Sequence, residues 1–245
     1  HDADPRRLAQ MLARVRDQWT ALGEAEPYWS VLTAERFRIS AIHEAGNLED
    51  FRATGRREAG LIDVFAARTG VSPRGGLCVE LGCGVGRVTR HLAERFDRVI
   101  GLDISPGNLA RCEAYMAEAG VTNVQTRPIR AMDDFSAFDG SDFLYSIISL
   151  QHSPPPLQKA ILRRAMQGLQ PGGIMLIQFL GEWLGYEFDV AAYVDAPSGG
   201  MEMHCLPRAV VLAEMAAQGV RPLDMVADAR TAALVGSVTV YAMKA

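Results

Sequence analysis

Two histidines and two carboxylates are the side chains of this sequence that could take part in catalysis or ligand binding. His152 follows the apolar run 142–149, and His204 ends a short segment that also carries Glu202. An imidazole has an unperturbed pKa near neutrality, so it can take a proton from a hydroxyl group. Glu80 and Asp103 each lie at the end of an apolar run. We therefore predict one ligand site, with His152 and His204 as the catalytic residues.

The sharpest pattern is a glycine loop that follows Glu80. It reads Glu80-x-Gly82-x-Gly84-x-Gly86 and includes Cys83. Glycines allow a tight turn with positive φ and keep side chains away from a ligand. We expect a helix to follow, with free N–H groups at its first turn that can bind a carboxylate or phosphate. The loop therefore predicts a nucleotide-type site in which Glu80 meets an ammonium group of the ligand.

Asp103 complements this loop from the next strand. It lies seventeen residues after Gly86, and Ile104 follows it. A carboxylate at that position can accept hydrogen bonds from two ribose hydroxyls. A nicotinamide-dependent enzyme would bind its cofactor with the same kind of glycine turn and ribose-binding carboxylate, but its glycine motif is G-x-G-x-x-G. Here the third glycine comes one position early, and Arg87 occupies its expected place.

The elements that position these residues alternate along the chain. We expect helices at 6–22, 31–43, 48–68 (broken near Gly55), 87–96, 106–120, 156–169 and 208–219. We expect strands at 77–81, 98–103, 124–129, 142–149, 174–180, 223–227 and 237–243. Such alternation predicts a parallel sheet with right-handed crossovers, closed on one side by an antiparallel hairpin. Residues 1–60 are expected to form a helical cap, and 61–245 the main domain, with an insertion at about 181–207.

With its glycine loop, Asp103, the Pro171-Gly172-Gly173 turn and the final strand pair, the chain resembles class I S-adenosylmethionine-dependent methyltransferases. The resemblance implies an α/β fold with a doubly wound, mostly parallel seven-stranded sheet. It also implies S-adenosylmethionine as cofactor and S-adenosylhomocysteine as product. Ile129 and Arg130 would cradle the adenine, with Asp133 or Asp134 as alternatives, and Ile147 would back the methionine part.

A narrower resemblance concerns the acceptor. The stretch from 150–156 through 201–204 is similar to bacterial methyltransferase-domain proteins of surface-polysaccharide and glycan clusters. It implies a small-molecule acceptor, such as a sugar hydroxyl, with His152 as base and His204 assisting. Trp29, Arg36 and Glu202 are the expected substrate contacts. N-methylation, nicotinamide-dependent oxidation and a non-catalytic cofactor-binding role remain open.

The composition of the chain limits the kinds of binding partner and the location that we expect. The net charge is −4, from 25 basic and 29 acidic residues, so nucleic acid is not an expected partner. No apolar run is long enough for a membrane span, and no signal peptide is recognisable. The four cysteines fit no zinc spacing, so we expect reduced thiols, a cytoplasmic location and no metal. The oligomeric state and the identity of the acceptor stay open.

Overall fold

A computed structural model describes residues 1–197, 199–228, 230 and 235–245. Its strands form one seven-stranded sheet in the order β3-β2-β1-β4-β5-β7-β6. The strands are β1 (Leu77–Leu81), β2 (Arg98–Asp103), β3 (Val124–Pro128), β4 (Ser141–Ser146), β5 (Leu169–Trp183), β6 (Val220–Asp228) and β7 (Val235–Lys244). Pairs from β3 through β5 are parallel, whereas β7 is antiparallel to both β5 and β6. The sheet is therefore mixed, and the predicted terminal hairpin is the reason.

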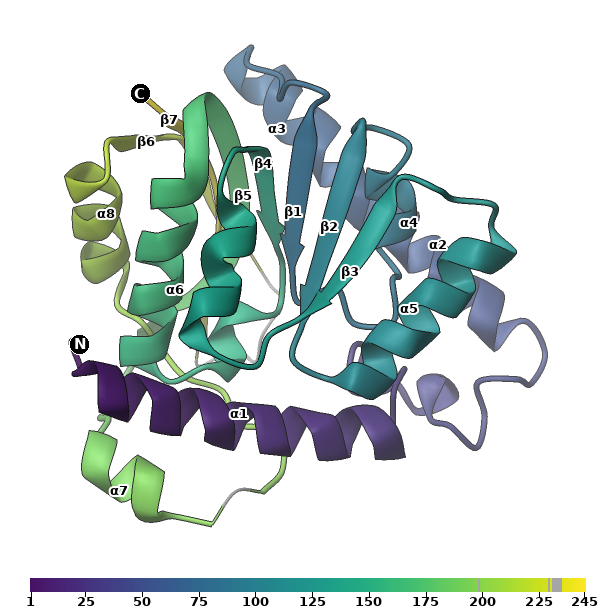
Figure 1. The fold of residues 1–245 in the computed structure, drawn as a ribbon, viewed down its shortest axis with the longest axis horizontal. Helices are drawn as coiled ribbons and strands as arrows, with labels where there is room; N and C mark the ends of the chain where they lie inside the picture. The colour runs from purple at the N-terminus through teal and green to yellow at the C-terminus, as the bar shows by residue number, and fades with distance from the viewer. Residues whose placement is uncertain (198, 229, 231–234) are drawn as a thin grey trace.

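Helices cover both faces of this sheet (Figure 1). They are α1 (Pro5–Ala25), α2 (Asn47–Ala59), α3 (Leu61–Thr69), α4 (Thr89–Leu92), α5 (Pro106–Glu118), α6 (Pro155–Gly168), α7 (Val190–Asp195) and α8 (Arg208–Ala217). Short 3-10 turns are η1 (Glu35–Phe37), η2 (Met132–Phe138) and η3 (Leu150–His152). None of the helices in the described ranges is long and apolar enough to cross a membrane.

Alternate side chains of the strands enter two separate cores, as strand pleating requires. On one face, Val79 of β1 joins a cluster with residues of α6 and α8, such as Ile161 and Val211. On the other face, Cys78 packs with Phe65 of α3 and with residues of α4. The loops at the carboxyl ends of β1, β2 and β4 are thereby fixed by packing on both sides.

Helix α1 is part of the main core. Its residues Met11, Leu12 and Val15 are buried in the same cluster as the first face of the sheet. Figure 1 shows α1 lying across the carboxyl ends of the central strands, with α7 of the insertion packed on its outer side. This position follows from the apolar stripe that the sequence places along the helix.

The helix predicted over 31–43 is wrong. The structure has only the 3-10 turn η1 there, because Ala34 and Arg38 on either side are extended. Phe37 and Ile42 turn inward onto Phe51 of α2 instead. Tertiary packing therefore overrides the local helix preference.

The predicted break near Gly55 is also wrong, and the chain breaks at Gly60 between α2 and α3. Gly55 instead permits a close approach. A Cβ at Gly55 would lie 1.8 Å from the carbonyl oxygen of Arg87. The predicted helix over 87–96 shortens to α4, a single turn at Thr89–Leu92, so the anion site predicted at its first turn has no support.

Candidate functional site

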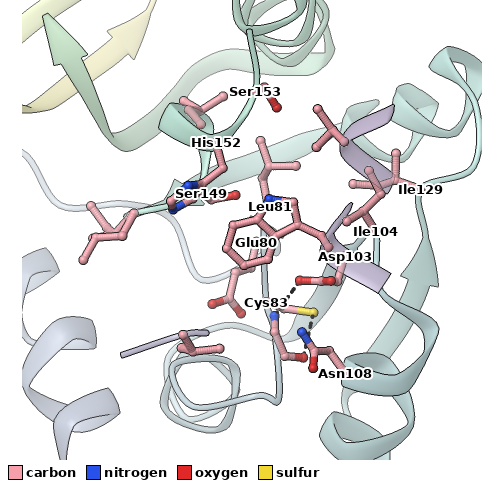
Figure 2. Close-up of a pocket in the computed structure, with 18 of the residues that line it drawn as sticks. Glu80, Leu81, Cys83, Asp103, Ile104, Asn108, Ile129, Ser149, His152 and Ser153 are labelled. Carbon is pink, nitrogen blue, oxygen red and sulfur yellow. Dashed lines mark hydrogen bonds between the residues drawn. The ribbon is translucent and has the colours of Figure 1, made fainter. Parts of the chain in front are cut away.

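A cavity of about 1020 Å³, part of it open to solvent, lies at the carboxyl ends of the strands. Ligands of open α/β sheets bind in this crevice. The lining residues are Leu12, Val15, Trp19, Ser30, Val31, Glu80, Leu81, Gly82, Cys83, Gly84, Arg87, Val88, Asp103, Ile104, Asn108, Ile129, Phe135, Tyr145, Ile147, Ile148, Ser149, Leu150, His152, Ser153 and Ile161. Figure 2 shows His152 and Ser149 on one side, facing Asp103 and Ile104 on the other.

The glycine loop turns back under β2. The N–H groups of Gly82 and Cys83 both donate to the carbonyl oxygen of Leu102, at 2.8 and 3.0 Å. Gly82 has a φ of +79°, and a Cβ there would lie 2.2 Å from the Ser149 hydroxyl oxygen. Both facts require glycine at this position. The loop therefore brings backbone to the cavity with no side chain in between.

Asp103 closes the loop from the tip of β2. Its Oδ2 accepts a hydrogen bond from the N–H of Gly84 at 2.8 Å, and its Oδ1 accepts one from Ser105 at 2.8 Å. A carboxylate offers about four lone-pair sites, so each oxygen can accept once more. Burial raises the pKa of Asp103, and the backbone N–H donors oppose this shift. The side chain is thus held ready for two further donors.

Glu80 lies on β1 beside the same cavity. Only 3% of it is exposed, and its Oε2 accepts a hydrogen bond from the Thr89 hydroxyl at 2.6 Å. Burial raises the pKa of Glu80 to about 7. A cation bound next to this carboxyl would favour its ionised form and lower its pKa again.

This pKa gives a first testable prediction. Binding of S-adenosylhomocysteine, whose amino group is cationic, should release about half a proton at about pH 7, because Glu80 must ionise. As pH falls below about 7, the affinity should drop toward about tenfold per unit. Calorimetry in buffers of different ionisation enthalpy measures both quantities. In Glu80→Gln the proton release should vanish, and its persistence would contradict the assignment.

His152 is held in one tautomer. Its Nδ1 lies 2.8 Å from the carbonyl oxygen of Glu202. A carbonyl can only accept, so Nδ1 carries the hydrogen and Nε2 keeps its lone pair. Burial lowers the pKa of His152 to about 4, and the ring packs against Trp19 with centroids 4.6 Å apart. The cavity therefore has a neutral nitrogen acceptor in its wall.

His204 lies outside the lining of the cavity. Its Nδ1 is 2.8 Å from the Tyr186 hydroxyl, and its Nε2 is 3.6 Å from Glu202 Oε2. The rings of Phe188 and Tyr193 meet its ring edge-to-face. The structure thus gives His204 a place in an aromatic box, while its backbone N–H donates to Gln151 next to His152.

Glu202 also joins the insertion to α1. Both of its carboxylate oxygens accept from Arg14, at 2.7 and 2.9 Å, and Arg14 lies over the Tyr193 ring. Gln18 donates to the carbonyl oxygens of residues 199 and 200. Two segments that are far apart in sequence are therefore joined directly, through the helix whose residues Leu12, Val15 and Trp19 line the cavity.

This contact gives a second prediction. The side chains of Arg14 and Glu202 are 9% and 26% exposed, so Glu202→Gln should cost about 1–2 kcal/mol of unfolding free energy, between surface and buried pairs. Denaturant unfolding measures it. Glu182→Gln is the matched control, because its pair with Arg208 is exposed and should cost less than about 0.5 kcal/mol. Equal losses in the two variants would show that the Arg14 contact adds nothing.

The remaining predicted residues divide into two groups. Cys83, Ile104, Ile129 and Ile147 line the cavity, as do Gly82 and Gly84. Residues outside the described lining are Gly86, Arg130, Trp29, Arg36, Glu202 and His204. Arg130 is exposed, and its backbone N–H donates to Asp134 at 2.7 Å. Trp29 stacks under Arg38, and Arg36 is exposed.

Sequence reasoning missed several lining residues. Trp19 lies on the helix predicted over 6–22 without a motif that marks it as a lining residue, and Phe135 belongs to η2, which was not predicted. Asn108 on α5 is 2% exposed, and its Oδ1 has no hydrogen-bond partner among the described residues. Among the residues that the structure describes, no group of three or more His, Cys, Asp or Glu side chains is arranged to hold a metal ion.

Comparison with known proteins shows which family and which fold this chain is similar to. Residues 78–173 match the family model described as a methyltransferase domain. Over these residues the chain is similar to methyltransferase domains. A solved magnesium protoporphyrin IX methyltransferase from Synechocystis with bound S-adenosylhomocysteine is similar over 96% of this chain and 100% of that one, with a TM-score of 0.64 and 16% identity. This similarity confirms the α/β fold with a seven-stranded sheet, whereas the N-terminal helical cap stays a prediction.

Two curated relatives match the methyltransferase domain more locally. A trans-aconitate 2-methyltransferase from Deinococcus radiodurans is 36% identical over 41% of this chain and 36% of its own length. A carboxy-S-adenosyl-L-methionine synthase from Citrifermentans bemidjiense is 27% identical over 47% and 48%. The chain thus spans half the length or less of these relatives. Together with the family match, they support the prediction of a methyltransferase domain that uses S-adenosylmethionine.

Proposed function

We propose that this protein transfers a methyl group from S-adenosylmethionine to a hydroxyl of a small-molecule acceptor, such as a sugar or a related metabolite. The observation that carries the proposal is His152. Its Nε2 is an unprotonated acceptor in the wall of the cavity, and its Nδ1 is fixed by the Glu202 carbonyl oxygen. An acceptor of this kind suits a hydroxyl nucleophile, which must lose a proton.

The residues of the cavity fit the cofactor. Asp103 has two free acceptor positions for ribose hydroxyls, and the orphaned Oδ1 of Asn108 adds a third acceptor. Ile104, Ile129 and Phe135 give an apolar wall for an adenine ring. When bound, S-adenosylmethionine supplies an activated methyl group on a sulfonium sulfur.

The chemistry then needs little beyond positioning. An oxygen of the acceptor attacks the methyl carbon in line. The new C–O bond forms as the C–S bond breaks, and S-adenosylhomocysteine leaves. The proton of the acceptor passes to Nε2 of His152. Because a methylated hydroxyl is a strong acid before it loses its proton, even an imidazole with a pKa of about 4 can accept it.

We also propose that the N-terminal segment 1–60 and the insertion 181–207 enclose the acceptor. Helix α1 contributes Leu12, Val15 and Trp19 to the cavity wall, and the Arg14–Glu202 pair ties it to the insertion. Enclosure of this kind excludes water from the reacting atoms. Within it, we assign Glu202 and His204 to positioning His152, because the Glu202 carbonyl oxygen accepts from the His152 ring and His204 lies beside the Glu202 carboxylate.

The test is a titration followed by a transfer assay. The full chain should bind S-adenosylhomocysteine with micromolar affinity in calorimetry, and should then move a labelled methyl group onto a hydroxyl acceptor in a screen of sugars and sugar nucleotides. Binding of a nicotinamide cofactor in its place would overturn the proposal. Preferential labelling of amines would shift it to N-methylation, and binding without any transfer would favour a non-catalytic role.

A further inference from the structure

The order of strands fixes how a ligand lies along the cavity. The lining runs from Ile129 after β3, past Asp103 on β2 and Glu80 on β1, to Ile147 after β4. With the ribose at Asp103 and the adenine toward Ile129, the amino-acid end of the cofactor falls between β1 and β4. This assignment rests on the proposed function. Arg87 lines the cavity too, and its charge acts on both Glu80 of β1 and Tyr145 of β4.

Arg87 is a buried cation with few partners. It is 6% exposed, and its one side-chain hydrogen bond within the described residues goes from Nη1 to the Thr54 hydroxyl at 3.1 Å. Its Nε is buried with no partner, and no carboxylate of the described residues lies within ion-pair distance of it. A guanidinium carries five N–H donors, so most of its binding capacity is unused. A buried charge without a counter-ion is costly, and it calls for an anionic partner.

The nearby charges do not supply this partner. Glu58 is paired with Arg230 at 2.8 Å. Burial raises the pKa of Glu80 to about 7, so its carboxyl is only partly ionised at neutral pH. Arg230 thus has a carboxylate partner in Glu58, and Asp228 acts on it as well. Of these two guanidinium groups, Arg87 is the one without an ion pair among the described residues, and it lines the cavity.

The fold holds Arg87 in this place. Gly55 lets α2 pack closely against the backbone of Arg87. A Cβ atom at position 55 would lie 1.8 Å from the carbonyl oxygen of Arg87, so only glycine fits. The adjacent Thr54 hydroxyl accepts from its guanidinium. Backbone and side chain are thus both fixed by α2. A guanidinium held in this way loses little entropy when it binds a carboxylate.

We propose that Arg87 binds the α-carboxylate of the cofactor's amino-acid part, while Glu80 beside it binds the α-ammonium. A guanidinium and a carboxyl group next to each other, and not paired with each other, are complementary to an amino-acid zwitterion. The cavity would then select for the complete amino-acid end of the ligand. Charge-assisted hydrogen bonds between guanidinium and carboxylate are among the strong ones in proteins.

The test compares two ligands in calorimetry, S-adenosylhomocysteine and its decarboxylated form, which keeps the amine. The wild-type chain should bind S-adenosylhomocysteine at least about tenfold more tightly. Arg87→Met should lose about tenfold or more for S-adenosylhomocysteine, and should bind the decarboxylated form within about threefold of wild type. Arg90→Met is the matched control, because Arg90 lies on the same turn, pairs with Glu94 and is outside the lining.

Other outcomes overturn the proposal. An equal loss for both ligands in Arg87→Met would make Arg87 a structural residue. Should that variant fail to fold, the wild-type comparison and Arg87→Lys decide, because lysine keeps the charge and loses the planar fork. Equal binding of both ligands by the wild type would overturn this inference alone. Binding of neither ligand would overturn the proposed function as well.

Discussion

Replacing Asp103 with alanine is expected to weaken binding of S-adenosylhomocysteine at least about tenfold, equivalent to about 1.4 kcal/mol. The carboxylate offers the ribose two acceptors, whereas the Oδ1 of Asn108 offers the cavity only one acceptor atom. It also holds the N–H groups of Gly84 and Ser105, so its loss loosens the loop on which the cofactor rests. Calorimetric titration of the variant beside the wild type measures the effect.

The same substitution should also destabilise the protein. Two backbone donors lose their acceptor, at about 1–3 kcal/mol for each one left buried and unsatisfied. The titration is therefore run well below the melting temperature of the variant. Asp97→Ala is the matched control, because Asp97 is exposed and lies outside the cavity lining. Unchanged affinity in a folded Asp103→Ala protein would remove Asp103 from the cofactor site.

The sequence predicts which residues of the glycine loop, β1 and β2 line the cavity, because its signals there are local. The glycine loop and the apolar runs around it lie within a few residues of one another, and each fixes its own backbone. Glu80 and Asp103 then meet because parallel strands bring their carboxyl ends to one edge. The strand at 174–180 was found for the same reason, although β5 extends further, from Leu169 to Trp183.

The part of the cavity around His152 and Arg87 depends on contacts between residues that are distant in sequence. No local sequence pattern predicts such contacts. His152 takes its tautomer from Glu202, fifty residues away. Arg87 takes its position from Thr54 and Gly55, more than thirty residues earlier. The helix at 31–43 was wrongly predicted for a similar reason, because its apolar residues pack against α2 and do not form one face of a helix. Arg36 was predicted on that helix, and it lies outside the lining of the cavity.

The second large effect is expected at His152. His152→Ala should lower kcat by about 10²–10⁴-fold, the usual range for a general base, with little change in affinity for S-adenosylhomocysteine. The cofactor contacts lie on β1 and β2, whereas His152 lies on η3 after β4, so the two effects separate. His43→Ala is the matched control, since His43 is exposed and outside the lining. Loss of cofactor binding in place of kcat would make His152 a packing residue.

The pH dependence distinguishes a base from a residue that merely packs. The pKa of His152 is lowered to about 4, so its imidazole is neutral, and able to accept a proton, at every pH above about 5. Wild-type kcat with saturating cofactor should therefore stay flat through neutral pH, while the cofactor's KM rises below about 7 as Glu80 takes up its proton. An acid limb of kcat near neutrality that disappears in His152→Ala would mean that the bound state returns the imidazole to its ordinary pKa. A limb that remains in the variant would have to arise from the acceptor itself, as expected for an amine nucleophile.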